Sequence, residues 1–181
     1  MLSLTPETFE TLNLLIREAI PSDTNRLQAI CNSWANKALL EGDNFEPHYI
    51  ENCIRNGDLP PIKGATKNRY QLKAILKKGT STPIGFFDLY HGYPNERVLW
   101  ISIFLIHPEY QQMGYGKEII DFIAINAKVN GYAALGLGVH LKNWKGIRFW
   151  HKCGFTQITS IKGDREYSET TFSVLGLERM L

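Results

Sequence analysis

Cysteine is scarce in this sequence. The 181 residues include only three, Cys31, Cys53 and Cys153. They are odd in number, lie far apart and form no C-x-x-C pair, so they suggest neither a disulfide framework nor a zinc site. We expect no bound metal. A reducing compartment suits such a chain, and we expect a cytoplasmic protein.

An excess of charge of one sign is also lacking. Lys plus Arg total 20 against 18 for Asp plus Glu, which leaves a net charge of +2 at pH 7. So small a net charge gives no broad electrostatic attraction to a nucleic acid or to an anionic membrane surface. We therefore expect neither as a partner, and the charge leaves the identity of the true partner open.

Long hydrophobic runs are missing. The longest run near the centre, 98–106, contains Ser102 and is far shorter than the roughly 20 residues of a membrane-spanning helix. Segment 1–6 has neither the basic start nor the apolar stretch of a secretory signal, and the acidic Glu7 and Glu10 argue against a transit peptide. We expect no membrane segment and no targeting segment.

The chain has enough length for one self-sufficient domain. Folding of 181 residues buries roughly 70% of the surface that the unfolded chain exposes. No internal repeat, low-complexity tract or clear boundary divides the sequence. We therefore expect a single domain over residues 1–181.

Strand-like and helix-like patterns follow one another along the chain and predict a mixed α/β fold. The expected strands are 13–18, 69–77, 84–90, 98–106, 132–139, 155–161 and 170–179. The expected helices are one after Asp23 that carries Leu27, Ile30, Cys31, Trp34 and Ala38 on one face, a short one from about residue 46 to Gly57, and the segments 114–129 and 143–152.

The arrangement of these elements can also be predicted. Segment 98–106 has almost no polar face, so it should be the central strand. We expect a strongly bent, mixed sheet of six or seven strands with helices on both faces. The sheet should be antiparallel in its first half and parallel where helix 114–129 crosses over.

The most informative segment joins the central strand to helix 114–129 and reads Ile-His-Pro-Glu-Tyr-Gln-Gln-Met-Gly-Tyr-Gly-Lys from residue 106 to residue 117. Gly114 and Gly116 allow a tight turn and a close approach of the backbone to a ligand. The unpaired N–H groups of the first helical turn, together with the helix dipole, favour an anion at this position. The segment therefore predicts a site for a pyrophosphate.

Other phosphate-binding motifs fail at defined positions. A Walker loop would need glycine in place of Gln111 and a hydroxyl residue in place of Glu118. A dinucleotide fingerprint beginning at Gly114 would need its third glycine at Ile119, and one beginning at Gly136 would need it at Leu141. A nucleotide-binding α/β domain is therefore a weaker alternative.

The spacing that remains, Q-x-x-G-x-G at Gln111, Gly114 and Gly116, resembles the acetyl-coenzyme A (acetyl-CoA) loop of the GNAT family of N-acetyltransferases. A second segment is similar to another signature of this family. It consists of Asn143, Gly146 and the run Phe-Trp-His-Lys-Cys-Gly-Phe at 149–155. The element order matches from about residue 14 to the C-terminus, whereas the motifs lie within 98–155.

The resemblance implies one GNAT-like acyl-CoA N-acyltransferase domain that uses acetyl-CoA as its acyl donor. It also implies an amine acceptor, which is a small molecule, an amino acid or a peptide N-terminus, and it suggests a homodimer. By the same resemblance, the pantetheine arm would contact Phe104, Ile106 and Asn143. The residues implied in holding the rest of the donor are Gln111, Gln112, Met113, Gly114, Tyr115, Gly116, Lys117, Gly146 and Phe149.

The sequence departs from the family pattern at two catalytic positions. Many relatives carry a carboxylate on the central strand, whereas 98–106 has only Ser102 as a polar side chain. Trp150 stands where the family often has a tyrosine that protonates the leaving sulfur, and an indole does not titrate as an acid. An acetyl-CoA-binding module with weak or lost catalysis is therefore the alternative to an active enzyme.

No general base can be assigned from the sequence. The candidates near the expected site are Asp88, His91, His107 and Glu109, among which His107 is the best match for proton transfer near neutral pH. We expect acceptor recognition from segments 34–61 and 86–94, which are rich in aromatic residues. Cys153 has no evident His and acid partners, so we interpret it as a packing residue.

Overall fold

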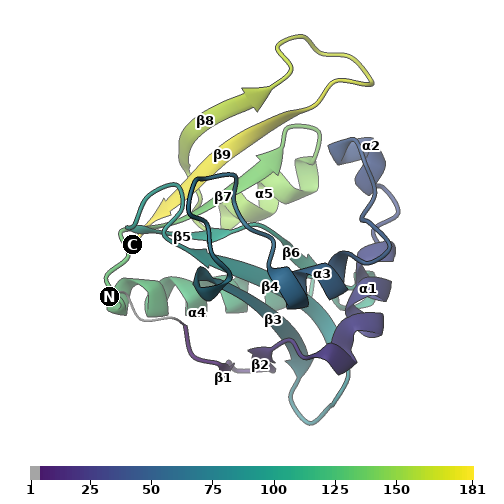
Figure 1. The fold of residues 1–181 in the computed structure, drawn as a ribbon, viewed down its shortest axis with the longest axis vertical. Helices are drawn as coiled ribbons and strands as arrows, with labels where there is room; N and C mark the ends of the chain where they lie inside the picture. The colour runs from purple at the N-terminus through teal and green to yellow at the C-terminus, as the bar shows by residue number, and fades with distance from the viewer. Residues whose placement is uncertain (1–4) are drawn as a thin grey trace.

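A computed structural model describes residues 5–181 of the chain, which form one mixed sheet with helices against it (Figure 1). Residues 1–4, part of the segment in which we expect no targeting signal, lie outside this range. Within residues 5–181, no helix is both long enough and apolar enough to cross a membrane.

The sheet of the described residues has nine strands in the order β1-β2-β3-β4-β5-β7-β9-β8, and β6 pairs with β4. β5 and β7 run parallel, and the other paired strands run antiparallel. The strands are β1 (Thr8–Glu10), β2 (Leu14–Glu18), β3 (Tyr70–Lys77), β4 (Pro83–His91), β5 (Val98–Ile101), β6 (Phe104–Ile106), β7 (Ala134–His140), β8 (Gln157–Gly163) and β9 (Ser173–Met180).

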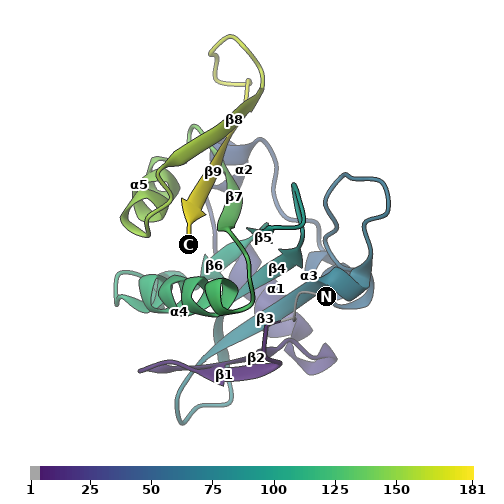
Figure 2. The same ribbon diagram turned by 90° about the vertical axis from the view of Figure 1, so that its left-hand side faces the viewer.

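The helices lie on both faces of this sheet (Figure 2). They are α1 (Thr24–Asn32), α2 (Lys37–Glu41), α3 (Tyr49–Asn56), α4 (Tyr115–Val129) and α5 (Trp144–Lys152). One hydrophobic cluster joins α4 and α5 to the sheet, and the other joins α1 and α3 to its opposite face. The predicted fold class and the parallel pairing across helix 114–129 are therefore confirmed.

The predicted number of strands, six or seven, is wrong for two reasons. The expected strand 98–106 is interrupted at Ser102 and Ile103, which divides it into β5 and β6. β1 was not predicted because it has only three residues; it is held where Phe9 stacks on Phe122 of α4, with ring centroids 4.1 Å apart.

The first expected helix also differs, because it ends before Trp34. The hydroxyl of Ser33 donates to the carbonyl of Ile30 at 2.7 Å, a local bond that competes with continuation of the helix. A separate helix, α2, begins at Lys37. The aromatic side chain at position 34 therefore lies in a connecting loop, beside the cavity described below.

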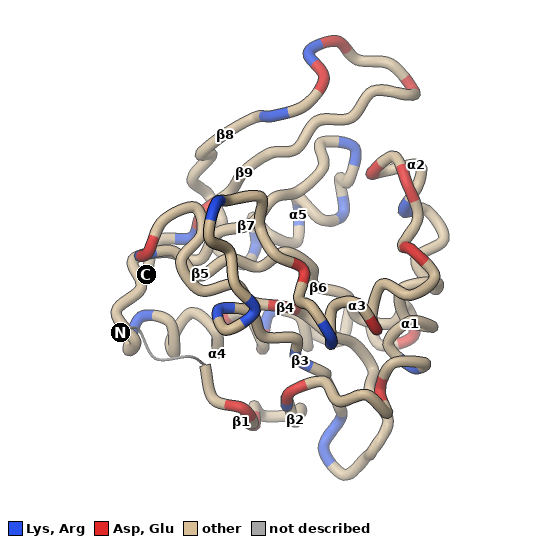
Figure 3. Tube along the Cα trace, viewed as in Figure 1, with Lys and Arg blue, Asp and Glu red and all other residues tan. Residues whose placement is uncertain are grey.

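Acidic and basic side chains are interspersed along the trace (Figure 3). β8 and β9 form a hairpin that projects beyond the rest of the sheet (Figure 1). The remaining strands carry α4 and α5 on one face and α1 and α3 on the other. The candidate site lies between β6, β7 and the first turn of α4.

Candidate functional site

The sheet opens between β6 and β7. The parallel pairing of β5 with β7 runs from Val98 and Ala134 as far as Ile101 and Leu137. Beyond that pair, β6 is paired with β4, and the rest of β7 is paired with β9. Within the described part of the chain, no pairing joins β6 to β7, so the two facing backbone edges remain free to bind an extended ligand.

A bulge lies where this opening begins. Between the pairs Phe87–Phe104 and Tyr90–Trp100, β4 advances three residues while the other strand advances four. The carboxylate of Asp88 accepts hydrogen bonds at this point from two backbone N–H groups of the interrupted strand. The two amides that the interruption removes from the ladder therefore find their acceptor in a side chain of the neighbouring strand.

The segment after β6 forms a turn with two left-handed residues, Gln112 with φ of 64° and Gly114 with φ of 84°. The side-chain amide of Gln111 donates to the carbonyl of Ile106 at 2.8 Å, which ties the turn to the end of β6. Gln111, expected to contact the donor, thus has a partner within the chain.

The N-terminus of α4 is open at Gly114, which is the N-cap residue of this helix. A Cβ placed on Gly114 would meet no atom within 4 Å. The N–H of Glu118 makes the first intrahelical bond, to the carbonyl of Gly114, so the N–H groups of 115–117 are among the orphan donors of the first turn. These donors and the positive end of a 15-residue helix suit the pyrophosphate of a coenzyme.

Gly116 has a different role from Gly114. A Cβ on Gly116 would lie 2.9 Å from ring atoms of Phe149 on α5. The ring of Phe149 also stacks near Phe104 of β6, with centroids 5.9 Å apart. Gly116 therefore lets α4 and α5 approach closely beside the opening, and Phe104 and Phe149 line the same region.

The other residues of the expected donor site divide into exposed and structural positions. Met113 is 55% exposed, and Lys117 forms an ion pair with Asp121 one turn further along α4. Asn143 caps α5, because its side-chain oxygen accepts the N–H of Gly146 at 2.9 Å. The expected contact between Asn143 and a pantetheine arm therefore competes with this helix-capping role.

Trp150 lies inside an aromatic cluster. Its ring contacts those of Phe104, Phe149 and Phe155 edge to face, with centroids 5.8, 4.8 and 5.2 Å away. It is only 9% exposed. Trp150 therefore packs its own helix, α5, against β6.

The candidates for a general base lie in contrasting surroundings. His91 is buried, with Nδ1 2.6 Å from the hydroxyl of Tyr132 and Nε2 2.9 Å from the side-chain oxygen of Gln71. Burial, and then the nearby cations of Lys73 and Arg69, lower the pKa of His91 to about 4. Because both ring nitrogens are engaged, His91 cannot accept a proton from a substrate.

His107 and Ser102 are more accessible. The Nδ1 atom of His107 accepts the N–H of Glu109 at 3.4 Å, so the ring caps the turn after β6. Glu109 itself is exposed. The exposed Ser102 lies at the bulge, and its backbone N–H donates to Asp88. A carboxylate oxygen of the exposed Glu109 lies 3.7 Å from the same Nδ1 atom of His107, so these two candidates are neighbours, and Ser102 contacts neither of them through the bonds described.

His140, at the end of β7, was missed by the sequence analysis. Leu135, Leu137 and Val139 point into the cluster with α4 and α5, so alternation places His140 on the opposite face, the face that α1 and α3 cover. Its Nδ1 atom is buried and has no hydrogen-bond partner among residues 5–181. A polar residue that ends an apolar strand was the available signal.

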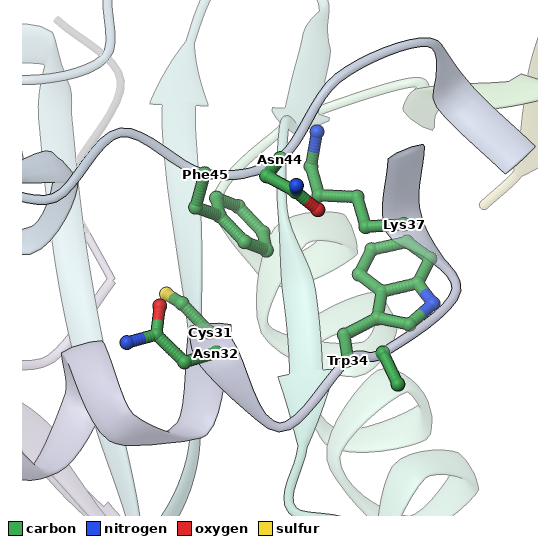
Figure 4. Close-up of a pocket in the computed structure, with 7 residues that line it drawn as sticks. Cys31, Asn32, Trp34, Lys37, Asn44 and Phe45 are labelled. Carbon is green, nitrogen blue, oxygen red and sulfur yellow. The ribbon is translucent and has the colours of Figure 1, made fainter. Parts of the chain in front are cut away.

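A cavity of about 340 Å³ lies between the end of α1 and the following loops (Figure 4). The Nζ atom of Lys37 is 4.8 Å from the ring centroid of Phe45 and 2.8 Å from a carboxylate oxygen of Asp43. The cavity falls within segment 34–61, except for its α1 residues. It is lined by Cys31, Asn32, Trp34, Ala35, Lys37, Asn44 and Phe45.

The three cysteines are free and buried. Burial raises the pKa of Cys31 to about 12, and those of Cys53 and Cys153 to about 11. Since the thiolate is the reactive form, these thiols are poor nucleophiles near neutral pH.

Comparison with known proteins identifies the family. The sequence model of the Acetyltransferase (GNAT) family matches residues 33–155, more than half of the chain. The chain belongs to the GNAT acetyltransferase family. GNAT acetyltransferases use acetyl-CoA as the acyl donor, in agreement with the resemblance of the loop. No curated protein sequence matches the chain.

Solved structures agree on the GNAT fold. An acetyltransferase from Thermus thermophilus has a TM-score of 0.70 and 20% identity, covering 96% of this chain and 100% of that one. A GNAT-family acetyltransferase from Bacillus anthracis has a TM-score of 0.70 and 15% identity, with coverages of 96% and 98%. YncA from Salmonella typhimurium, solved with acetyl-CoA, has a TM-score of 0.60 and 16% identity, with coverages of 93% and 94%.

Proposed function

We propose that this GNAT protein is a single-domain enzyme that transfers the acetyl group of acetyl-CoA to an amine by direct attack in a ternary complex. One observation carries the proposal: the opening between β6 and β7 begins beside the open N-terminus of α4. The opening suits an extended arm and the helix N-terminus suits a pyrophosphate, and acetyl-CoA combines both groups.

The residues around this site fit the donor. The free first-turn N–H groups of α4 would hold the pyrophosphate, and the open side of Gly114 leaves room for it. The free backbone edges of β6 and β7 would hold the pantetheine arm by hydrogen bonds. When bound, acetyl-CoA supplies a thioester, an acyl group activated for attack by an amine.

The amine must lose a proton before it attacks. An amine with a pKa near that of lysine costs about 4–5 kcal/mol to deprotonate at neutral pH. We assign acceptance of this proton to the imidazole of His140. It lies past the last β5–β7 pair, on the face of α1 and α3, and its Nδ1 atom lacks a protein partner among the described residues.

We place the acceptor on the same face of the sheet, with the cavity beside Trp34 and Phe45 as part of its site (Figure 4). Aromatic walls near the carboxylate of Asp43 suit an amine that is cationic in solution. The ammonium group of Lys37 is already paired with this carboxylate, so an acceptor would compete with it.

The test combines donor binding with turnover. Calorimetry with coenzyme A should detect binding to the wild-type protein, and Gly114→Val should abolish it by filling the open side of the turn. Gly79→Val is the matched control, because Gly79 also has a left-handed backbone, with φ of 78°, and also has no atom within 4 Å of an added Cβ. It should bind coenzyme A as the wild type does.

Release of free thiol from acetyl-CoA with a panel of amines then tests the reaction. Turnover with at least one amine supports the enzyme. The packing position of Trp150 and the absence of a carboxylate from β5 and β6 favour the alternative, a binding module without catalysis. Tight binding of coenzyme A without thiol release on any amine would support that alternative.

A further inference from the structure

The side chain of Asp88 makes an unusual set of contacts at the bulge. One oxygen, Oδ1, accepts the N–H of Ser102 at 2.9 Å and the N–H of Ile103 at 3.0 Å. The N–H of Asp88 donates to the carbonyl of Ile103 at 3.1 Å. A side chain of β4 thus supplies the acceptor for two amides that the bulge removes from the regular ladder.

The surroundings of Asp88 do not favour a charge. The residue is 0% exposed, and its second oxygen, Oδ2, has no hydrogen-bond partner within residues 5–181. The polar groups that face it are the hydroxyl of Tyr70 on β3, Tyr49 and Cys53 on α3, and the carboxyl of Asp58. Burial, and to a smaller extent the carboxyl of Asp58, raise the pKa of Asp88 to about 7, although the N–H groups of Ile103 and Ser102 lower it.

Burying a carboxyl group costs free energy, which only the hydrogen bonds that it makes can offset. These bonds coincide with the opening of the sheet. The last pair of β5 with β7 involves Ile101, and the two amides held by Asp88 belong to the next two residues. The contact therefore lies where the pairing of β5 with β7 ends and the chain continues as β6, which pairs with β4.

We propose that Asp88 is a positioning residue that holds the Ser102–Ile103 bulge and thereby keeps the β6 edge open for the pantetheine arm of the donor. The inference rests on the proposed function, since it assigns the opening to that arm. It does not make Asp88 a catalytic residue, because the side chain acts through the backbone of Ser102 and Ile103.

Two ligands separate the bulge from the phosphate site. Coenzyme A contains both the pyrophosphate and the pantetheine arm, whereas 3′-phospho-ADP lacks the arm. Calorimetry on Asp88→Ala should show coenzyme A binding weakened at least about tenfold, because two amides lose their acceptor, with 3′-phospho-ADP binding unchanged. Asp88→Asn keeps an acceptor oxygen and should bind both ligands within about threefold of the wild type.

Ile16→Ala is the control for general destabilisation. Ile16 is fully buried in β2, which pairs with β1 and β3, away from the bulge. It should bind both ligands as the wild type does. Asp88→Ala should therefore lose coenzyme A binding while Ile16→Ala and Asp88→Asn keep it. This pattern distinguishes positioning of the bulge from a general effect on stability.

Three results would overturn the inference: unchanged coenzyme A affinity in Asp88→Ala, an equal loss of both ligands, or a loss in Asp88→Asn as large as in Asp88→Ala. Failure of the wild type to bind either ligand would instead overturn the proposed function. If Asp88→Ala does not fold, hydrogen exchange of the backbone amides provides the test. The Ser102 and Ile103 amides should exchange slowly in the wild type and in Asp88→Asn. Fast exchange of both amides in the wild type would contradict the inference.

Discussion

The buried carboxyl of Asp88 should make the stability of the protein depend on pH. Its pKa is raised from 3.8 to about 7, mainly by burial. The folded protein therefore retains a proton that the unfolded chain releases above about pH 4. The stabilisation linked to this proton is complete below the unfolded pKa and is lost as the pH rises through the folded pKa.

The change Asp88→Asn removes this titration and keeps an oxygen for the two amides of the bulge. Each unit of pKa difference corresponds to about 1.4 kcal/mol. Between about pH 5 and about pH 8, the free energy of unfolding of the wild type should therefore fall by about 2–3 kcal/mol relative to that of Asp88→Asn. Asn cannot titrate, so this difference isolates the contribution of Asp88 from those of other groups.

Urea unfolding of both proteins across this pH range measures the difference directly. The free energy of unfolding of the wild type, relative to that of Asp88→Asn, should be highest at the acidic end and should fall as the pH rises. A difference that stays constant with pH, or one that changes in the opposite direction, would refute the reasoning. A constant difference would mean that the carboxyl of Asp88 is already ionised in the folded protein at about pH 5.

Three further predictions concern other parts of the molecule. Asn143→Ala should lower the free energy of unfolding by about 1 kcal/mol through loss of the α5 cap, and an unchanged melting temperature would contradict this. Lys73→Met should lower it by about 1–3 kcal/mol in urea unfolding, since the carbonyls of Pro6 and Glu7 and the carboxylate of Glu18 lose the buried ammonium group that donates to them, and a neutral effect would contradict the contribution of these bonds. His140→Ala should lower kcat by a factor of about 10² to 10⁴ with coenzyme A affinity retained, whereas the matched change His107→Ala should alter kcat by less than about tenfold; equal effects in steady-state assays would remove the assignment of the base.

Local patterns made the loop and the helix after it predictable. Gly114 and Gly116 lie at the start of an amphipathic helix, and both the turn and α4 depend on residues close together in sequence. The distinct roles of the two glycines were not predictable. Gly114 faces open space, whereas Gly116 has no room for a Cβ because Phe149, more than thirty residues later, packs against it.

The bulge and the candidate base depend on contacts between distant segments. Segment 98–106 is apolar except for Ser102, and one polar residue is not enough to predict that the strand divides there. The division is held by Asp88, which belongs to a different strand. The burial of the Nδ1 atom of His140 without a partner among residues 5–181 likewise follows from what surrounds the end of β7 rather than from the residues beside it in sequence.

Hydrogen exchange with and without coenzyme A tests the central claim most directly, namely that the donor lies between the α4 N-terminus and the opening of the sheet. The account predicts that coenzyme A slows exchange at the amides of residues 114–117, on β6 and in the second half of β7. Protection confined to other segments, such as residues 31–45 around the cavity, with no change at residues 114–117, would contradict it.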